Sequence, residues 1–174
     1  MTPSFRALEP ASVLAEPAYV ENAAVLCSAF FFLSPCVQMV QLFSSRGAAL
    51  ATINPLTLLL LFFNCSLWMS WGVFLPMPPA VPGNLLGLVA GAIYLLLCWG
   101  WVICKGVRAP AWGARGAFGT VTILALSGIL AAYASLSKEY AEHVGLFAMF
   151  VSVALFAAPL SELAKVLEEK CSDR

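Results

Sequence analysis

Four polar or wide-ringed side chains, Asn64, Trp68, Trp71 and Asn84, interrupt an otherwise apolar stretch that runs from residue 54 to residue 94. Asn64, Trp68 and Trp71 are spaced at i, i+4 and i+7, which places them on one face of a helix. Such a face suits a sugar, because its C–H faces stack on indole rings while its hydroxyls bond to amides. The pattern therefore predicts a wall of a binding site for an uncharged polar solute.

The same residues also have a structural interpretation. An Asn in a membrane helix often bonds a neighbouring helix, for about 1 kcal/mol, and a Trp often anchors at the membrane interface. We favour this interpretation for Asn64 alone and leave both open for Trp68. Asn84 directly follows Pro82 and Gly83 at an expected helix start, so it could also be a helix cap.

The composition predicts an integral membrane protein, since 61% of the 174 residues are hydrophobic and only 10% are charged. Nine basic residues balance nine acidic ones, and no basic run forms a patch for nucleic acid, so nucleic-acid partners are not expected. Five apolar runs are each about twenty residues long, enough to cross a bilayer core of about 30 Å as helices. They cover residues 23–43, 55–75, 81–103, 116–136 and 144–166.

Residue types absent from the apolar runs exclude several classes of transporter and enzyme. The first four runs contain no Asp, Glu, Lys, Arg or His. Carriers that couple transport to protons or voltage need such residues inside the membrane. The chain has no G-x-x-x-x-G-K-[ST] run for ATP, and the runs hold no paired carboxylates, Ser/His pair or Cys/His metal spacing. We therefore expect neither an enzyme nor a cofactor, and any solute should move down its own gradient.

Prolines, glycines and polar segments predict where the helices start, bend and pack closely. The Ser34-Pro35 pair predicts a kink in the first run, and Pro55 suits the first turn of the second. A stripe of small residues (Gly83, Gly87, Gly91) predicts that the third run packs in the middle of its bundle. The polar segment from Ser137 to Gly145 is expected to be a turn before the fifth run, which carries Pro159 in its second half.

The loop charges predict the orientation, because Lys and Arg near span ends stay on the cytoplasmic side. The loops after the first, third and fifth runs are basic, which places the N-terminus outside or in a lumen and the C-terminus in the cytosol. A plasma-membrane location is expected. The basic residues on the cytosolic side are Arg46, Lys105, Arg108, Arg115, Lys165, Lys170 and Arg174.

Several segments together resemble the SWEET sugar transporters of the PQ-loop group. FLSPCVQMVQLF looks like the LSP motif of that family's first helix, and FNCSLWMSWG like its second-helix motif. PGNLLGLVAGAIY is similar to its third-helix pattern, and FAAPLSELAKVLEEK to the segment that opens its second repeat. The first and fifth runs also resemble each other, which suggests an internal repeat. The resemblance covers about residues 23–174.

The resemblance implies an all-α membrane fold in which two parallel three-helix bundles enclose a sugar. It implies a tail at 1–22, a first three-helix repeat at 23–104, a loop and linker helix at 105–137, a helix at 138–166 that opens the second repeat, and a cytosolic tail at 167–174. Thr57 departs from the family's second-helix hinge proline, and helices six and seven, which would complete the pocket, are not in the sequence.

The resemblance also implies individual roles. Trp68 and Asn84 match sugar-binding positions, Trp71 matches a gate aromatic, and Pro35 and Pro159 match hinge prolines of the two bundles. The function expected is facilitated, bidirectional transport of a mono- or disaccharide across the lipid bilayer, with the pocket completed in a homo- or hetero-oligomer or by a longer chain. The alternative is a shortened membrane protein that does not transport but associates with full-length transporters and modulates them.

Overall fold

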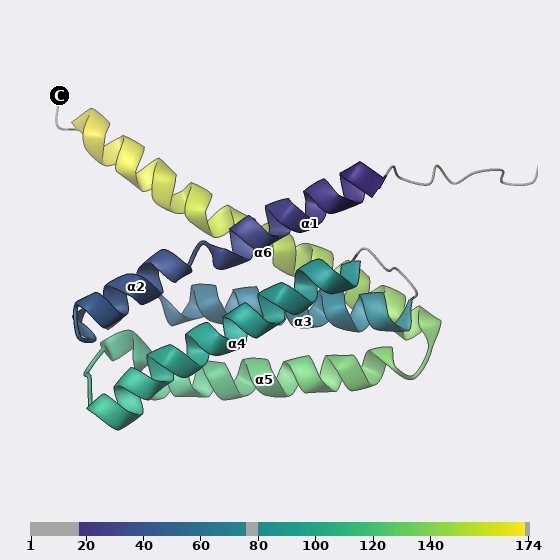
Figure 1. Cartoon of the computed structure of the whole chain (residues 1–174), viewed down its shortest axis with the longest axis horizontal. Coiled ribbons are helices and arrows are strands. Elements are labelled where there is room, and N and C mark those ends of the chain that lie inside the picture. Colours follow the sequence, from purple (N-terminus) through teal and green to yellow (C-terminus); the bar gives the residue numbers. More distant parts are fainter. Residues whose placement is uncertain (1–17, 76–79, 173–174) are drawn as a thin grey trace, which may run out of the picture.

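The computed structural model describes residues 18–75 and 80–172, and within them the side chains of residues 22, 23 and 25–155. Every regular element in this part of the chain is helical, and four segments are long and apolar enough to span a membrane: 25–44, 55–74, 80–105 and 114–134. The structure is thus that of an all-α membrane protein (Figure 1). Its elements are α1 (Ala18–Leu33), α2 (Cys36–Ser44), η1 (Ala48–Ala51), α3 (Pro55–Phe74), α4 (Ala80–Lys105), η2 (Pro110–Trp112), α5 (Ala114–Ala134) and α6 (Lys138–Ser172).

The predicted kink in the first run is confirmed as a break between α1 and α2 at Ser34 and Pro35. Pro35 has no N–H to donate to the carbonyl one turn back, so that carbonyl needs another partner inside the membrane. The Ser34 hydroxyl donates to the Phe31 carbonyl oxygen at 2.7 Å. The Tyr94 hydroxyl of α4 donates to the next carbonyl, that of Phe32, at 3.2 Å, so a neighbouring helix stabilises the break.

The central element of the described structure is α3, which packs against α4, α5 and α6. The helix starts at Pro55 because of two residues. The side-chain oxygen of Asn54 accepts a hydrogen bond from the Leu56 N–H at 3.0 Å, and Pro55 suits the first turn, where no N–H is needed. Because α3 contacts three helices, half of its span is buried, whereas α5 leaves most of its span exposed to the surroundings. Side chains on α3 are therefore the best placed to line an interior site.

The glycine stripe lies where close helix packing needs it. A Cβ at Gly87 would come within 2.5 Å of the Cys65 Sγ of α3 and 2.8 Å of the Phe32 ring of α1. A Cβ at Gly91 would meet Phe62 of α3 at 3.3 Å. The third span, α4, thus packs closely against both α1 and α3, as the stripe of small residues predicts.

The turn predicted before the fifth run is wrong, because α6 already begins at Lys138. The Ser137 hydroxyl accepts a hydrogen bond from the Tyr140 N–H at 3.2 Å, and Glu139 lies in the first turn, where the positive end of the helix dipole favours an acid. The fifth predicted span, 144–166, falls within α6, which stays helical through residue 159. The Pro159 side chain lies outside the described residues.

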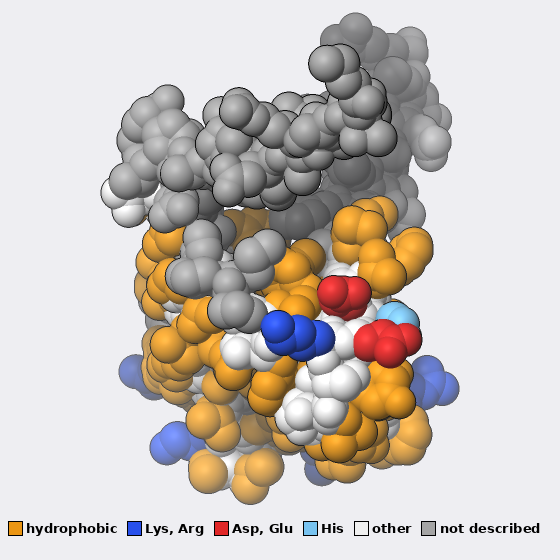
Figure 2. Space-filling view, turned by 90° about the vertical axis from the view of Figure 1, so that its right-hand side faces the viewer, with side chains coloured by type: hydrophobic (Ala, Val, Ile, Leu, Met, Phe, Trp, Pro, Cys, Tyr) orange, Lys and Arg blue, Asp and Glu red, His pale blue; other side chains and the backbone are white. Residues whose placement is uncertain are grey.

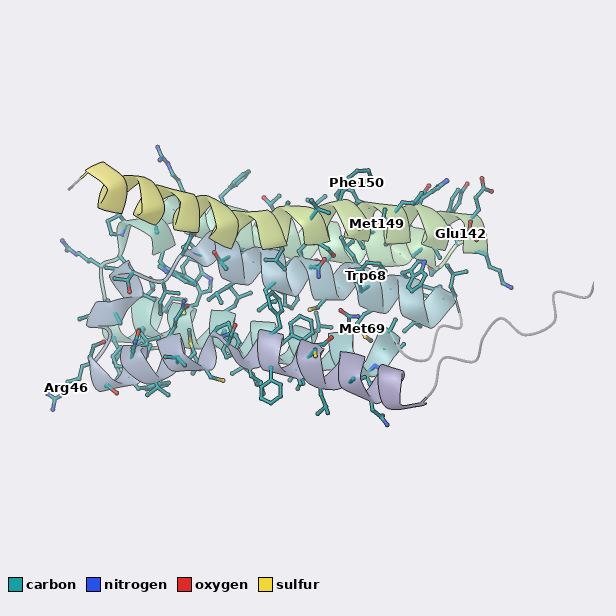
Figure 3. The ribbon with its side chains drawn as sticks, turned by 90° about the horizontal axis from the view of Figure 1, so that it is seen from above. Arg46, Trp68, Met69, Glu142, Met149 and Phe150 are labelled. Carbon is teal, nitrogen blue, oxygen red and sulfur yellow. The ribbon has the colours of Figure 1, made fainter. Side chains whose placement is uncertain are left out.

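The described charged side chains gather at the two ends of the bundle. Arg46 marks one end and Glu142 the other (Figure 3). Figure 2 looks onto the Glu142 end, where the acidic side chains and the histidine lie together within a largely hydrophobic surface. The expected 1–22 tail lies mostly outside the described residues, and its last part, from Ala18, belongs to α1.

Substituting Gly87 tests the packing of α4. We expect Gly87→Ala to destabilise the fold by about 1–3 kcal/mol, because the new methyl group overlaps Cys65 and Phe32. Gly100→Ala in the same helix is the matched control, since nothing lies within 4 Å of its Cβ position and Ala favours the helix. The measurement is unfolding of the purified protein in a denaturing detergent titration. Equal stability of the two variants would contradict this packing.

Candidate functional site

The candidate site is built on one face of α3, as the spacing of Asn64, Trp68 and Trp71 predicts. The Trp68 Nε1–H donates to the Ser152 Oγ of α6 at 3.0 Å, and the Ser152 hydroxyl lies 2.7 Å from the Asn64 Oδ1, which accepts from it. The Ala148 carbonyl oxygen is a second acceptor for the same hydroxyl at 2.9 Å. Asn64 is buried, with 6% of its surface exposed, so its hydrogen bond is made inside the bundle.

Ser152 therefore joins two helices by serving as acceptor and donor at once. A hydroxyl can do so because it has one proton and two lone pairs. The interhelical hydrogen bond favoured for Asn64 is present, and Trp68 makes one as well. Ser152 could not be identified from its local sequence, because a single serine in an apolar run is common and its partners are more than eighty positions away.

Trp68 and Trp71 form an aromatic corner beside α6. Their ring centroids are 5.3 Å apart and their planes are at 90°, the edge-to-face arrangement that aromatic pairs prefer. Trp71 lies directly on Gly145, where any side chain would overlap its indole. The two indoles line a hollow of about 410 Å³, together with Glu142, Leu146 and Met149 of α6.

Figure 3 shows this hollow's position: Trp68 lies beside Met149, while Phe150 points away from the bundle. Glu142, nearer the end of the bundle, is exposed, so a carboxylate stands at the mouth of an otherwise aromatic and apolar hollow. The inner side of the hollow thus offers ring faces, and its outer side offers a hydrogen-bond acceptor.

A second hollow, of about 310 Å³, lies between α1 and α3. It is lined by Asn64 from α3 and by Cys27, Ser28, Phe31 and Phe32 from α1. Ser28 is a polar residue of this site that sequence reasoning missed, for the same reason as Ser152. The Asn64–Ser152–Trp68 chain of hydrogen bonds separates the two hollows and has one end on each.

Asn84 lies apart from Asn64, Ser152 and Trp68. Its Nδ2 donates to the carbonyl oxygen of Ala80, one turn earlier in its own helix, at 2.8 Å, and it lines neither hollow. Since α4 begins at Ala80, Asn84 is inside the helix and does not cap its start. Its neighbour Gly83 faces Ser28 of the second hollow, with 3.6 Å from its Cβ position to the Ser28 Cβ.

Pro35 and the single histidine of the chain lie apart from the two hollows. Pro35 is at the break between α1 and α2, and His143 is exposed, with its Nδ1 3.4 Å from the Tyr133 hydroxyl. Among the described side chains, no group of three His, Cys, Asp or Glu residues is close enough to hold a metal ion.

Compared with protein-family profiles, curated proteins and solved structures, the chain has no match in any of the three. The resemblance to the SWEET family therefore rests on the sequence motifs, and membership stays a prediction.

Ser152 provides a direct test of the interhelical link. We expect Ser152→Ala to lower the free energy of unfolding by about 1 kcal/mol, because the Trp68 N–H and the Asn64 oxygen both lose their partner. Ser127→Ala is the matched control, since the buried Ser127 hydroxyl has no hydrogen-bond partner among the described residues. Unfolding curves for the two variants are the measurement, and a greater loss for Ser127→Ala would contradict the link.

Proposed function

We propose that the protein transports a sugar across a membrane by facilitated, bidirectional diffusion. The observation that carries the proposal is the hydrogen-bond chain Asn64–Ser152–Trp68, which stands between two hollows inside apolar, membrane-length helices. Lipid contact alone requires no such chain. A path for a polar solute requires both polar partners and space.

Sugar is the solute class that this chemistry fits best. Indole rings stack on the C–H faces of a pyranose, and the amide of Asn64 and the hydroxyl of Ser28 can exchange hydrogen bonds with its hydroxyl groups. Both hollows are in the range of about 300–1,000 Å³ that small-molecule sites occupy. In this proposal Trp68 lines one wall of the pocket, Asn84 joins that wall once its amide is free, and a second bundle supplies the other wall.

Alternating access needs a flexible point, and we assign it to the break at Pro35. Besides the backbone bond from the Ser34 N–H to the Phe31 carbonyl, two hydrogen bonds at the break come from side chains, the hydroxyls of Ser34 and Tyr94. These two can be exchanged without unfolding a helix. Trp71, nearer the Glu142 end than Trp68, is the proposed gate, and Pro159 is the proposed hinge of the second bundle. For Asn84 to bind sugar, its amide must leave the Ala80 carbonyl.

The orientation belongs to the same proposal. The described basic loops lie at the end opposite Glu142, which fits a cytosolic position for that end and an outer position for the mouth at Glu142. The proposed membrane is the plasma membrane.

Uptake into liposomes tests the proposed site. We expect Trp68→Ala and Asn84→Ala each to lower the initial rate of radiolabelled hexose or sucrose uptake by about tenfold or more, the effect of losing about 1.4 kcal/mol of binding. His143→Ala is the control, because His143 is exposed and outside both hollows. Uptake that is indifferent to both substitutions would contradict the site, and no uptake by the wild-type protein would favour a modulator of other transporters.

A gradient experiment tests the absence of coupling. The described interior of the first four spans carries no charged side chain, so we expect the sugar only to equilibrate across the liposome membrane. An imposed pH gradient or membrane potential should leave the final inside concentration equal to the outside concentration. Accumulation above the outside concentration would show coupling and contradict the proposal.

A further inference from the structure

The end of the bundle opposite Glu142 has an unusual concentration of free positive charge. Four basic side chains project from it, and all four are exposed. Within the described residues, none of them has an ion pair or a hydrogen bond from its side chain. The described acidic side chains, Glu139 and Glu142, are on the other end, in the first turns of α6. The four basic residues are Arg46, Lys105, Arg108 and Arg115.

One of these charges, on Arg108, lines a preformed hollow of about 440 Å³ at the connection between α4 and α5. It is lined by Val102, by residues 106–110 including Arg108, and by Trp112 and Gly113. Lys105 directly precedes Gly106, and Arg115 lies two residues after Gly113. Arg46 is next to it as well, because Gly47 packs against Val107, with 2.9 Å from its Cβ position to the Val107 Cγ2.

The hollow is held in shape by buried contacts. Trp112 is completely buried, and its Nε1–H donates to the Ile53 carbonyl oxygen at 2.9 Å. Gly106, with a φ of 65°, ends α4 in the left-handed conformation, and the Val107 N–H then bonds to the Trp101 carbonyl oxygen at 3.2 Å. A ligand here would therefore meet an ordered loop, and little entropy would be lost in fixing it.

Exposed apolar side chains lie close to the hollow along the chain. Ile103, at the end of α4, and Phe118, in the second turn of α5, are both 75% exposed. The ends of two membrane-length helices lie at the level of lipid headgroups. A molecule that fits this arrangement has a negatively charged head for the basic hollow and hydrocarbon chains for these apolar side chains.

We propose that Arg108, Arg115, Lys105 and Arg46 form a binding site for the headgroup of an anionic phospholipid. The phosphate accepts hydrogen bonds from the guanidinium groups, and the acyl chains run along the exposed faces of α4 and α5. This site is independent of the proposed transport path, which involves the hollows near Trp68 and Asn64.

Native mass spectrometry of the full chain in mild detergent tests the site, with phosphatidylglycerol and phosphatidylcholine of identical acyl chains as probes. We expect phosphatidylglycerol to be retained more strongly. Each basic residue near the membrane surface contributes about fivefold to anionic lipid binding, so Arg108→Gln should weaken retention about fivefold, and Arg108→Gln with Arg115→Gln about twenty-five-fold. Lys138→Gln, which removes one exposed charge from the other end, should leave retention unchanged.

Equal retention of the two lipids, or an equal loss in Lys138→Gln, would overturn the proposal. Displacement of the bound lipid by inorganic phosphate at millimolar concentration would also overturn it, since it would indicate a soluble anion as the ligand. If the Arg108 variants fail to fold, the wild-type protein decides: its preference for phosphatidylglycerol should disappear in high salt, which screens exposed charges. A preference that persists in high salt would contradict a site of exposed cations.

Discussion

The hydrogen bonds that Asn64 and Trp68 require inside an apolar bundle govern the arrangement of α3 and α6. No water is available in the hydrocarbon region to satisfy an amide or an indole N–H, so each must find a partner in the protein. Ser152 meets both needs with one hydroxyl. That hydroxyl joins α6 to the central helix in the register that places Gly145 opposite Trp71 and leaves the hollow beside both indoles.

The same requirement explains the break at Pro35. A proline in a membrane helix leaves a carbonyl group without its usual donor, and here Ser34 and Tyr94 supply hydroxyl donors around it. The glycine stripe of α4 contributes to this, because the close approach at Gly87 brings α4, and with it Tyr94, against α1. Packing and hydrogen bonding at the proposed hinge are therefore coupled, and movement there has to exchange bonds.

Much of the helical framework could be predicted from the sequence, because long apolar runs, Pro55, the Ser34-Pro35 pair and the glycine stripe are local signals. The start of α6 could not be predicted, since a polar, charged segment is typical of a turn. The signal for a helix there was the Ser137 cap, which accepts a hydrogen bond from the Tyr140 N–H. Helical spacing predicted that Trp68 shares a helix face with Asn64 and Trp71. Ser28 and Ser152 were missed because their roles depend on partners far away in the chain, and the amide of Asn84 bonds its own helix, which spacing cannot reveal.

In the proposed transport path, an uncharged sugar binds against Trp68. Tryptophan fluorescence of the purified protein, titrated with hexose or sucrose, reports on this contact. We expect a saturable change in emission that is lost in Trp68→Phe and kept in Trp101→Phe, since Trp101 packs against Phe43 near the basic end, away from both hollows. A wild-type protein without any sugar-dependent change, or a Trp68→Phe variant that retains it, would contradict sugar binding at Trp68.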